Sequence, residues 1–318
     1  MSRCRFCGAP VDPLYSVSIA GQTRQLQRCR RCLACGIDEL IPETVLQSYY
    51  EGDYFHQSDW EIAKSRLLAT DYARKCDRHA LLSSGVFHRL EIGASFGFFA
   101  DLVHRRTGQP THFLEVSREC RTHIQNRFPA LVCRGGTLDD LPPQPIFDRV
   151  FGFHLLEHLQ SVESFLCSLA LRMKPGGLAF FLTPNAASIG FFRHGLEWGW
   201  SCPNQHCSFL SPKIPAAFYQ SAGFSLESVY SMRPAHIHTP SGLLVALDRF
   251  STKLLSNRTR PLSMRSLPAK VVGRALDTIR LQFVQNRPAA RLLGLERMLH
   301  LIRGPQQHDE LVLLLRRT

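Results

Sequence analysis

The fold is decided by the stretch Leu90-Glu91-Ile92-Gly93-Ala94-Ser95-Phe96-Gly97-Phe98-Phe99. Its first residues complete a short apolar strand over 86–92, and its last residues begin a helix that is expected to run to about Arg106. Between them lies a turn with two glycines, and glycine lets the backbone adopt a positive φ and approach a ligand closely. A glycine turn at the carboxyl end of such a strand indicates a nucleotide site in a parallel α/β sheet.

The chain beyond the turn alternates between strands and helices. Six more strands are expected, at 111–116, 131–133, 147–153, 178–182, 224–232 and 310–315. Strands that alternate with helical patterns of about 10–15 residues are typical of a parallel, doubly wound sheet. Residues 43–84, before the turn, are expected to be helical. The sequence therefore predicts an α/β fold with a seven-stranded sheet.

The turn does not fit two common phosphate-binding patterns. A dinucleotide fingerprint needs glycine at 93, 95 and 98, and the chain has Gly93, Ser95 and Phe98 there. No phosphate-cradling G-x-x-x-x-G-K-[ST] sequence occurs in the chain. The pattern therefore favours a ligand without a pyrophosphate.

The turn and five later motifs resemble the class I S-adenosylmethionine-dependent methyltransferases over roughly residues 43–235. The first motif of that family is a strand end followed by G-x-G-x-G, with Ser95 here in place of the central glycine. The later motifs are F-D-x-V…l-E-H-l at 147–158, K-P-G-G at 174–177, T-P-N at 183–185, H-x-x-F-S at 206–211 and a-G-F at 222–224. The resemblance implies a Rossmann-like, doubly wound sheet that binds S-adenosyl-L-methionine.

The resemblance also implies which residues meet the cofactor. In the family, the strand-end acid and the turn hold the methionine part, and an acid that ends the second strand grips the ribose hydroxyls. Residues after the third strand flank the adenine, and a residue after the fourth strand lies near the methionyl end. The implied cofactor-binding residues are Glu91, Gly93, Ala94, Ser95, Gly97, Glu115, Thr137, Leu138 and His154.

Two histidines, His158 and His206, are the predicted catalytic residues. Methyl transfer to oxygen usually needs a base, and histidine suits that role near neutral pH. A packed, hydrogen-bonded histidine is the alternative for each. The run 154–158 also matches H-x-x-E-H, an inverted zinc-protease signature, but that function needs a helix and this run directly follows a strand. The aromatic loop with Phe191, Phe192, Trp198 and Trp200 is expected either to wall the acceptor pocket or to pack in the core.

Five of the eleven cysteines fall in the first 35 residues. Cys4-x-x-Cys7-Gly8 and Cys32-x-x-Cys35-Gly36 have the spacing of two zinc knuckles, so Cys4, Cys7, Cys32 and Cys35 are the predicted ligands of a structural Zn²⁺. Cys29 with Cys32 is the alternative second pair, and Cys32 with Cys35 is preferred because a glycine follows it. Such a module resembles a subset of the methyltransferases, many of which act on sugars, polyketides or other secondary metabolites.

The formal net charge of +12 is concentrated at the two ends of the chain. Residues 1–40 carry +3 and residues 241–318 carry +9. Three amphipathic stretches over 241–305 predict a basic helical insertion that contacts an anionic membrane face, packs on the core or forms a dimer interface. No apolar run approaches the roughly 20 residues that span a bilayer, and no apolar segment follows the N-terminus, so a cytoplasmic protein is expected.

Four domains are predicted: a zinc-binding module at 1–42, the cofactor-binding core at 43–240, the basic insertion at 241–305 and a terminal strand at 306–318. The predicted function is methylation of a small-molecule, sugar-linked or lipid-linked acceptor, at oxygen. RNA methylation, with nucleic acid as partner, is one alternative, because knuckles and basic segments also occur in RNA-binding proteins. A non-catalytic zinc-binding scaffold with a degenerate methyltransferase fold is the other, and Ser95 is its support.

Overall fold

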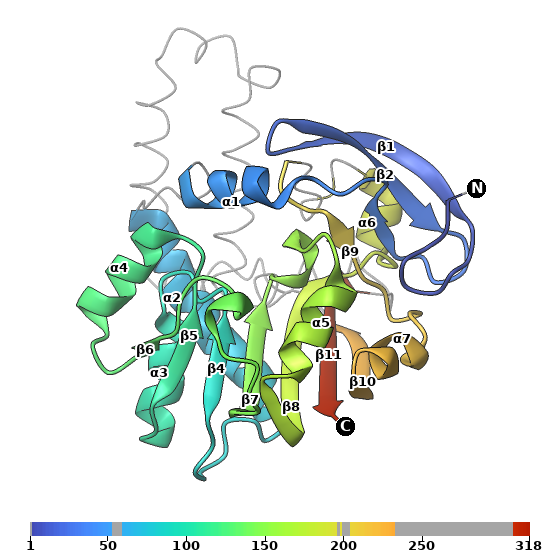
Figure 1. Ribbon diagram of the computed structural model, residues 1–318. Helices are drawn as coiled ribbons and strands as arrows, with labels where there is room; N and C mark the ends of the chain where they lie inside the picture. Colours follow the sequence, from blue (N-terminus) through green and yellow to red (C-terminus); the bar gives the residue numbers. More distant parts are fainter. Residues whose placement is uncertain (1, 53–58, 196–197, 199–203, 233–307) are drawn as a thin grey trace, which may run out of the picture. The chain divides into compact units, whose positions relative to one another are not determined.

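The computed structural model describes residues 2–52, 59–195, 198, 204–232 and 308–318 (Figure 1). The chain divides into two compact units. The first comprises residues 1–56, 69–232 and 307–318, and the second comprises residues 57–68 and 233–306. The predicted zinc module and most of the predicted cofactor-binding core therefore belong to one unit, and the predicted insertion at 241–305 lies outside the described residues.

A seven-stranded sheet forms the centre of the first unit, as predicted. Its order is β10-β11-β8-β7-β4-β5-β6. The strands are β4 (Arg89–Ile92), β5 (Thr111–Leu114), β6 (Val132–Cys133), β7 (Phe147–Phe153), β8 (Met173–Pro184), β10 (Phe224–Met232) and β11 (Glu310–Arg317). β4 to β8 are parallel, whereas β11 pairs antiparallel with β8 and β10. Because β4 comes first in the chain and lies between β5 and β7, the strand order reverses beside it, which is where open α/β sheets bind ligands.

The helices follow the strands in the predicted alternation. They are α1 (Glu43–Gly52), α2 (Asp59–Asp77), α3 (Phe98–Thr107), α4 (Arg118–Arg127), α5 (Val162–Ala170), α6 (Ile189–His194) and α7 (Ala216–Ser221), with 3₁₀ turns η1 (Leu138–Asp140) and η2 (Leu156–His158). Serine caps fix three of the starts: Ser117 accepts a hydrogen bond from Cys120 N at α4, Ser161 accepts one from Ser164 N at α5, and Ser188 accepts one from Phe191 N at α6.

Large apolar side chains on the central strands form the core. Phe113 on β5, Phe151 on β7 and both Phe180 and Phe181 on β8 have no exposed surface. Parallel strands that are covered on both faces read as continuous apolar runs, which is the pattern of these segments. Each fully buried phenylalanine contributes roughly 1.5–3 kcal/mol. The packed strands thus give the loops at their carboxyl ends a rigid base.

Two strand starts differ from the sequence-based expectation by three or more residues. β4 begins at Arg89 rather than at 86, and Val86 is 83% exposed. β8 begins at Met173 rather than at 178, because the K-P-G-G segment is part of the strand. The pairing of β7 with β8 has a register shift at this segment. Gly176 has a φ of 77° there, a conformation that glycine adopts without steric cost. Three carboxyl ends also differ by two residues: β5 ends at Leu114 rather than at 116, β8 at Pro184 rather than at 182, and β11 at Arg317 rather than at 315.

A second, four-stranded sheet was not predicted. It has the order β1-β2-β3-β9, with β1 (Val11–Ile19), β2 (Gln22–Cys29), β3 (Cys35–Ile37) and β9 (Ser208–Phe209). A two-residue turn with positive φ at Ala20 (49°) and Gly21 (74°) joins β1 to β2, as in twisted β-hairpins. Figure 1 shows this sheet and α1 beyond the carboxyl ends of the parallel strands.

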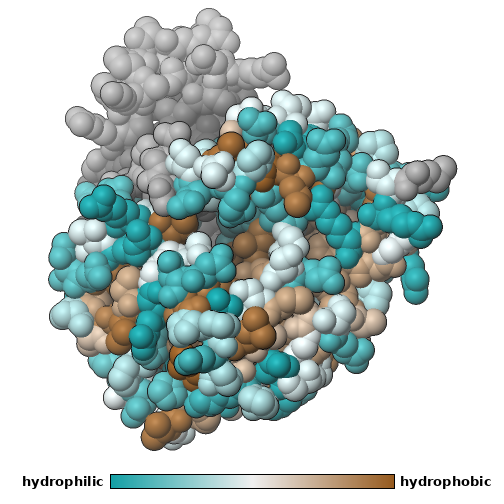
Figure 2. Space-filling view, in the orientation of Figure 1, coloured by the Kyte–Doolittle hydropathy of each residue, from teal (hydrophilic) through white to brown (hydrophobic). Residues whose placement is uncertain are grey.

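The surface shows scattered hydrophobic residues. On the face in Figure 2 the described residues are mainly hydrophilic, and the hydrophobic ones form small separate groups. Leu40, Val86 and Phe192 are exposed large hydrophobic residues that lie far apart in sequence. Within the described part of the chain, none of the helices has the length and hydropathy needed to cross a bilayer.

Candidate functional site

The glycine turn after β4 holds three residues with positive φ. Gly93, Ser95 and Gly97 have φ values of 73°, 52° and 76°. A Cβ on Gly97 would lie 2.9 Å from Ile124, so glycine is needed there for close packing of α3 against α4 as well as for the backbone angle. Ser95, which replaces the family's central glycine, adopts the left-handed conformation despite its side chain. Strained residues of this kind gather at ligand sites.

The strand-end acids Glu91 and Glu115 both face this turn. Glu91 accepts a hydrogen bond from Ala100 N (3.0 Å), and Glu115 accepts one from Ser95 N (2.7 Å). Glu115 also accepts one from Ser117 N (2.9 Å), so each of its carboxylate oxygens binds one backbone N–H. Burial raises the pKa of both carboxyls. Each oxygen retains a lone pair, which leaves capacity for ligand hydroxyls.

The remaining turn residue and the predicted adenine side lie next to β5. Ala94 N donates to Leu114 O (3.2 Å), and Glu115 N donates to Gly135 O (3.0 Å) after β6. Thr137 caps η1, and Leu138 is buried. The carboxylate of Asp140, which was not predicted, accepts from Gly136 N (2.6 Å) and Thr137 N (3.0 Å); these bonds lower its pKa. The loop that carries Thr137 and Leu138 is thus fixed beside Glu115.

His154 follows β7 and begins the second side of the site. Its φ is 53°, and its backbone N–H donates to Leu182 O (2.7 Å). Its Nδ1 lies 3.2 Å from Glu157 Oε1, and its Nε2 lies 3.7 Å from Glu310 Oε1. The left-handed residue ends the strand, and Leu156–His158 forms only a 3₁₀ turn. His154 and His158 therefore do not share a helix face, which argues against the inverted zinc-protease geometry.

Glu157 is the buried centre of this region and was not predicted. It has no exposed surface, and its Oε2 accepts a hydrogen bond from Thr183 Oγ1 (2.9 Å). Burial alone would raise the pKa of Glu157, but the hydrogen bond from His154 and the charges of the surrounding histidines lower it to about 2. The carboxylate is therefore anionic at neutral pH.

The two predicted catalytic histidines lie together. The ring centroids of His158 and His206 are 4.7 Å apart, and Cys207 N donates to Glu157 O (2.8 Å), which fixes the second segment against η2. The Tyr50 hydroxyl lies 3.3 Å from His158 Nδ1. Burial lowers the pKa of His158, which leaves it neutral near pH 7. A Cβ on Gly93 would lie 3.6 Å from Leu155 Cδ1, so the segment that leads into η2 lies next to the glycine turn.

A buried ion cluster supports the same edge of the sheet. Lys75 Nζ lies 2.8 Å from Asp71 Oδ2 and 2.7 Å from Glu310 Oε2, and its side chain is 4% exposed. Because Glu310 also faces His154, the start of β11 is coupled to the end of β7. No local sequence signal indicates this cluster, since Lys75 and Glu310 are 235 residues apart.

Most of the aromatic loop packs in the core. Phe191 and Trp198 are buried against Phe209, with ring centroids 5.7 Å and 6.3 Å away. Phe192 is 55% exposed, with the Arg28 guanidinium 3.8 Å from its ring centroid. Trp200 lies outside the described residues. Of the two predicted roles, core packing fits Phe191 and Trp198.

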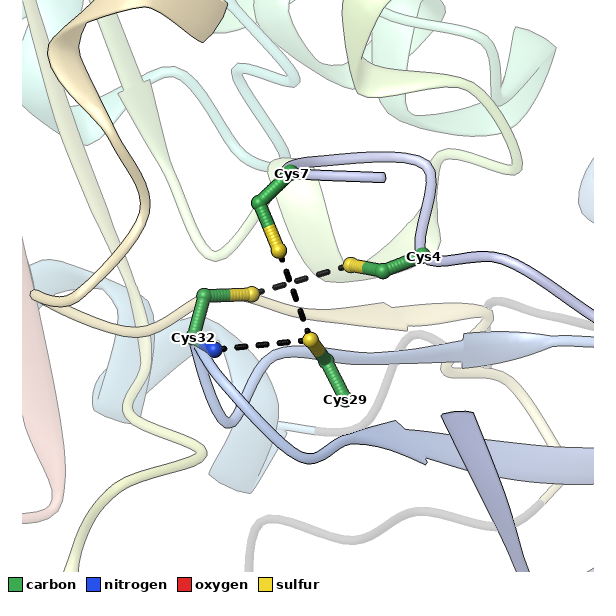
Figure 3. A group of neighbouring side chains, drawn as sticks. All are labelled: Cys4, Cys7, Cys29 and Cys32. Atoms are coloured by element: carbon green, nitrogen blue, oxygen red, sulfur yellow. Dashed lines mark hydrogen bonds between the residues drawn. The ribbon is translucent and has the colours of Figure 1, made fainter. Parts of the chain in front are cut away.

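Four cysteines of the N-terminal segment form a separate cluster, shown in Figure 3: Cys4, Cys7, Cys29 and Cys32. The four Sγ atoms lie within 4.8 Å of one another, with 3.6 Å between Cys4 and Cys32 and 3.4 Å between Cys7 and Cys29. Sulfurs at the corners of a Zn²⁺ tetrahedron are about 3.8 Å apart for Zn–S bonds of about 2.3 Å. The donor set and its spacing therefore fit a zinc ion.

The predicted ligand Cys35 requires a correction, because Cys29 takes its place beside Cys32. Leu33 follows this pair and has a φ of 63°, the conformation that Gly8 (71°) supplies after Cys7. The glycine after Cys35 was thus a misleading signal, since a leucine completes the second knuckle. Cys35 lies instead in β3, where burial raises its pKa to about 12.

The two knuckles are near copies of each other in their backbone hydrogen bonds. Gly8 N donates to Cys4 O (2.9 Å) and Leu33 N donates to Cys29 O (3.1 Å). Backbone N–H groups also point at sulfur: Phe6 N lies 3.4 Å from Cys4 Sγ, and Cys32 N lies 3.4 Å from Cys29 Sγ. Such donors stabilise thiolates, the form of cysteine that binds metal.

Comparison with known proteins agrees with this geometry. The matching protein family is described as a methyltransferase domain and covers residues 64–229, more than half of the chain. Malonyl-[acyl-carrier protein] O-methyltransferase of Chlorobium luteolum is 33% identical over 140 residues, which are 41% of this chain and 51% of that protein. A ubiquinone biosynthesis O-methyltransferase of Paramagnetospirillum magneticum is 26% identical over 153 residues, 45% of this chain and 61% of that protein.

The chain spans about half the length of the first curated relatives that it matches. Among solved structures, coclaurine N-methyltransferase bound to N-methylheliamine and SAH aligns with a TM-score of 0.50 at 14% identity, over 84% of this chain and 75% of that one. At this identity the likeness shows the fold alone. The chain belongs to the methyltransferase-domain family, as a class I, S-adenosylmethionine-dependent member.

Proposed function

We propose that the protein transfers a methyl group from S-adenosylmethionine to an oxygen atom of a small-molecule, sugar-linked or lipid-linked metabolite. The supporting observation is the pairing of His158 and His206, whose ring centroids are 4.7 Å apart, in a region where Leu155, three residues before His158, lies next to Gly93 of the glycine turn. The two relatives named above are, by their names, O-methyltransferases of malonyl-[acyl-carrier protein] and of ubiquinone biosynthesis. Both belong to small-molecule metabolism.

The residues around the turn fit the cofactor. When bound, S-adenosylmethionine supplies a methyl group that its sulfonium already activates. Glu115 would hold the ribose hydroxyls through the lone pairs that its backbone bonds leave, and residues 93–97 would meet the methionyl part. Glu91 fixes the start of α3, and Thr137 and Leu138 would flank the adenine.

The histidine pair would act on the acceptor. Neutral His158 accepts the hydroxyl proton, and the Tyr50 hydroxyl orients its ring through Nδ1. His206 lies edge-to-face with the His158 ring, and the hydrogen bond from Cys207 N–H to Glu157 O holds its segment in place. The protein's main contribution is then alignment of the two reacting molecules.

We also propose a structural Zn²⁺ at Cys4, Cys7, Cys29 and Cys32, because the four sulfurs have the spacing of a tetrahedral site. None of the ten cysteines among the described residues forms a disulfide bond. Cysteines of this number without a disulfide fit a reducing compartment, which supports a cytoplasmic location.

The experiment that tests the function is labelling of an unknown acceptor. The full-length protein is incubated with methyl-labelled S-adenosylmethionine and a metabolite extract, and the labelled product is identified by mass spectrometry. A labelled small molecule that is absent with the Glu115→Ala variant supports the proposal. Label in bulk RNA would favour the alternative acceptor, and no cofactor binding in calorimetry would refute both enzymatic functions.

A further inference from the structure

A second group of metal-ligating side chains lies on the acceptor side: Glu157, His158 and His206. One ligand atom of each lies within 4.8 Å of those of the other two. Glu157 and His206 are buried, and His158 is partly exposed, so the group opens on one side. Among the described residues this is the one group besides the cysteine cluster with such spacing.

We infer that Glu157, His158 and His206 form a binding site for a divalent first-row transition-metal cation. The inference deepens the proposed function, and the role of the cation rests on that function. Binding of the cation rests on the ligand geometry alone. Two imidazoles and one carboxylate are a ligand set that binds Mn²⁺, Fe²⁺, Co²⁺ or Zn²⁺ and leaves coordination positions open.

The three ligands are held in place before any cation binds. The Cys207 N–H bond to Glu157 O and the Ser208 Oγ bond to Leu159 O (2.7 Å) fix the His206 segment against η2. Preorganisation of this kind keeps the ligands at the required spacing when they come from distant parts of the chain.

A second layer of hydrogen bonds orients the ligands themselves. Thr183 donates to Glu157 Oε2, and the Tyr50 hydroxyl meets His158 Nδ1. Metal-binding histidines usually make such an outer bond with the second ring nitrogen, and ligating carboxylates are hydrogen-bonded in the same way. Each carboxylate oxygen of Glu157 can keep its present partner and still coordinate, because it has two lone pairs.

The charges of the group also favour a cation. Glu157 has no exposed surface, and a carboxylate enclosed in protein needs hydrogen bonds or a countercharge. A divalent cation would balance the carboxylate. The oxygen and nitrogen ligands of this group differ from the four soft sulfurs of the cysteine cluster, which select Zn²⁺. A harder cation such as Mn²⁺ therefore distinguishes the two sites.

A cation here would bind the acceptor through an oxygen. Coordination lowers the pKa of a bound hydroxyl, so its O–H proton passes to solvent water and the cation stabilises the oxyanion that remains. The histidines would then serve as ligands, and oxygen rather than carbon would be the methylated atom. The acceptor class would be one with a hydroxyl or a pair of oxygens that can chelate.

The test uses the zinc-loaded, full-length protein and Mn²⁺ alone as probe. Mn²⁺ binding is measured by electron paramagnetic resonance and calorimetry, and pulsed spectra of the wild-type complex are searched for nitrogen couplings from imidazole. We expect one site with nitrogen couplings, and at least about tenfold weaker binding in both His206→Asn and Glu157→Gln. The control is His104→Asn, on α3, which should bind as wild type does.

Absence of nitrogen couplings, or unchanged Mn²⁺ affinity in both variants, would overturn the inference. The wild-type spectrum decides even if a variant fails to fold. Calorimetry with S-adenosylmethionine is run in parallel to separate the two proposals. Mn²⁺ binding without S-adenosylmethionine binding supports the site and refutes the proposed function, whereas S-adenosylmethionine binding by the zinc-loaded protein with no Mn²⁺ binding overturns the site alone.

Discussion

Replacement of Glu115 by glutamine perturbs the proposed ribose contact with little change of shape. The carboxylate accepts hydrogen bonds from Ser95 N (2.7 Å) and Ser117 N (2.9 Å), one on each oxygen. An amide keeps one acceptor oxygen and places an NH₂ donor at the other position. One backbone N–H then loses its acceptor, and any ribose hydroxyl loses a charged partner.

The size of the effect follows from these bonds. A hydrogen bond to a charged group contributes about 1.5–3 kcal/mol, and a neutral one about 0.5–1.5 kcal/mol. Glu115→Gln should therefore weaken S-adenosylmethionine binding by about 1–3 kcal/mol, a roughly 5- to 150-fold rise in Kd. The free energy of unfolding should fall by a similar amount, about 1–3 kcal/mol, because a buried donor is left without a partner.

Calorimetry measures the Kd, and urea denaturation measures the stability separately. Glu119→Gln is the matched control, because Glu119 is an exposed acid near the start of α4 and the same chemical change is made there. An unchanged Kd for Glu115→Gln, with the protein folded, would refute the placement of this carboxylate at the ribose.

Three further predictions follow from the described contacts. Cys29→Ser should lose zinc in elemental analysis and Cys35→Ser should retain it; the opposite result would restore the sequence-based ligand set. Lys75→Met should lower the free energy of unfolding by about 3–5 kcal/mol, because its two carboxylate partners lose their cation. Lys174→Met, at a 40% exposed side chain, should cost less than about 1 kcal/mol in the same urea titration. Ser95→Gly removes a left-handed serine and should leave stability unchanged or raise it by up to about 1 kcal/mol; a clear loss in urea denaturation would show that the serine side chain is needed.

The features that could be predicted from the sequence have local signals. The seven strands of the main sheet were expected from apolar runs bounded by turns, and all seven are present. The class of protein was indicated by the glycine turn and the ordered motifs after it, and the family match agrees. The same motifs contain His158 and His206, the two predicted catalytic residues, and the structure places their rings together.

The features that were missed depend on contacts between distant segments or on backbone angles. The sequence shows that glycine follows Cys35, but not that Leu33 adopts a φ of 63° and completes the knuckle of Cys29 and Cys32. The short strand β9 exists only because β3 lies beside it, so it has no pattern of its own. Glu157 stood inside a recognised motif, yet only its burial among histidines shows that it is the centre of the group.

The first 42 residues are bonded to both segments that carry His158 and His206. Arg5 donates to Gln160 O (2.9 Å), two residues after His158, and β3 pairs with β9, which starts two residues after His206. A fragment that starts after residue 42 would keep the cofactor turn but lose the strand that anchors His206. If zinc binds at the four cysteines as proposed, its loss or oxidation of the thiols would disturb the segments of His158 and His206 and leave the turn after β4 in place.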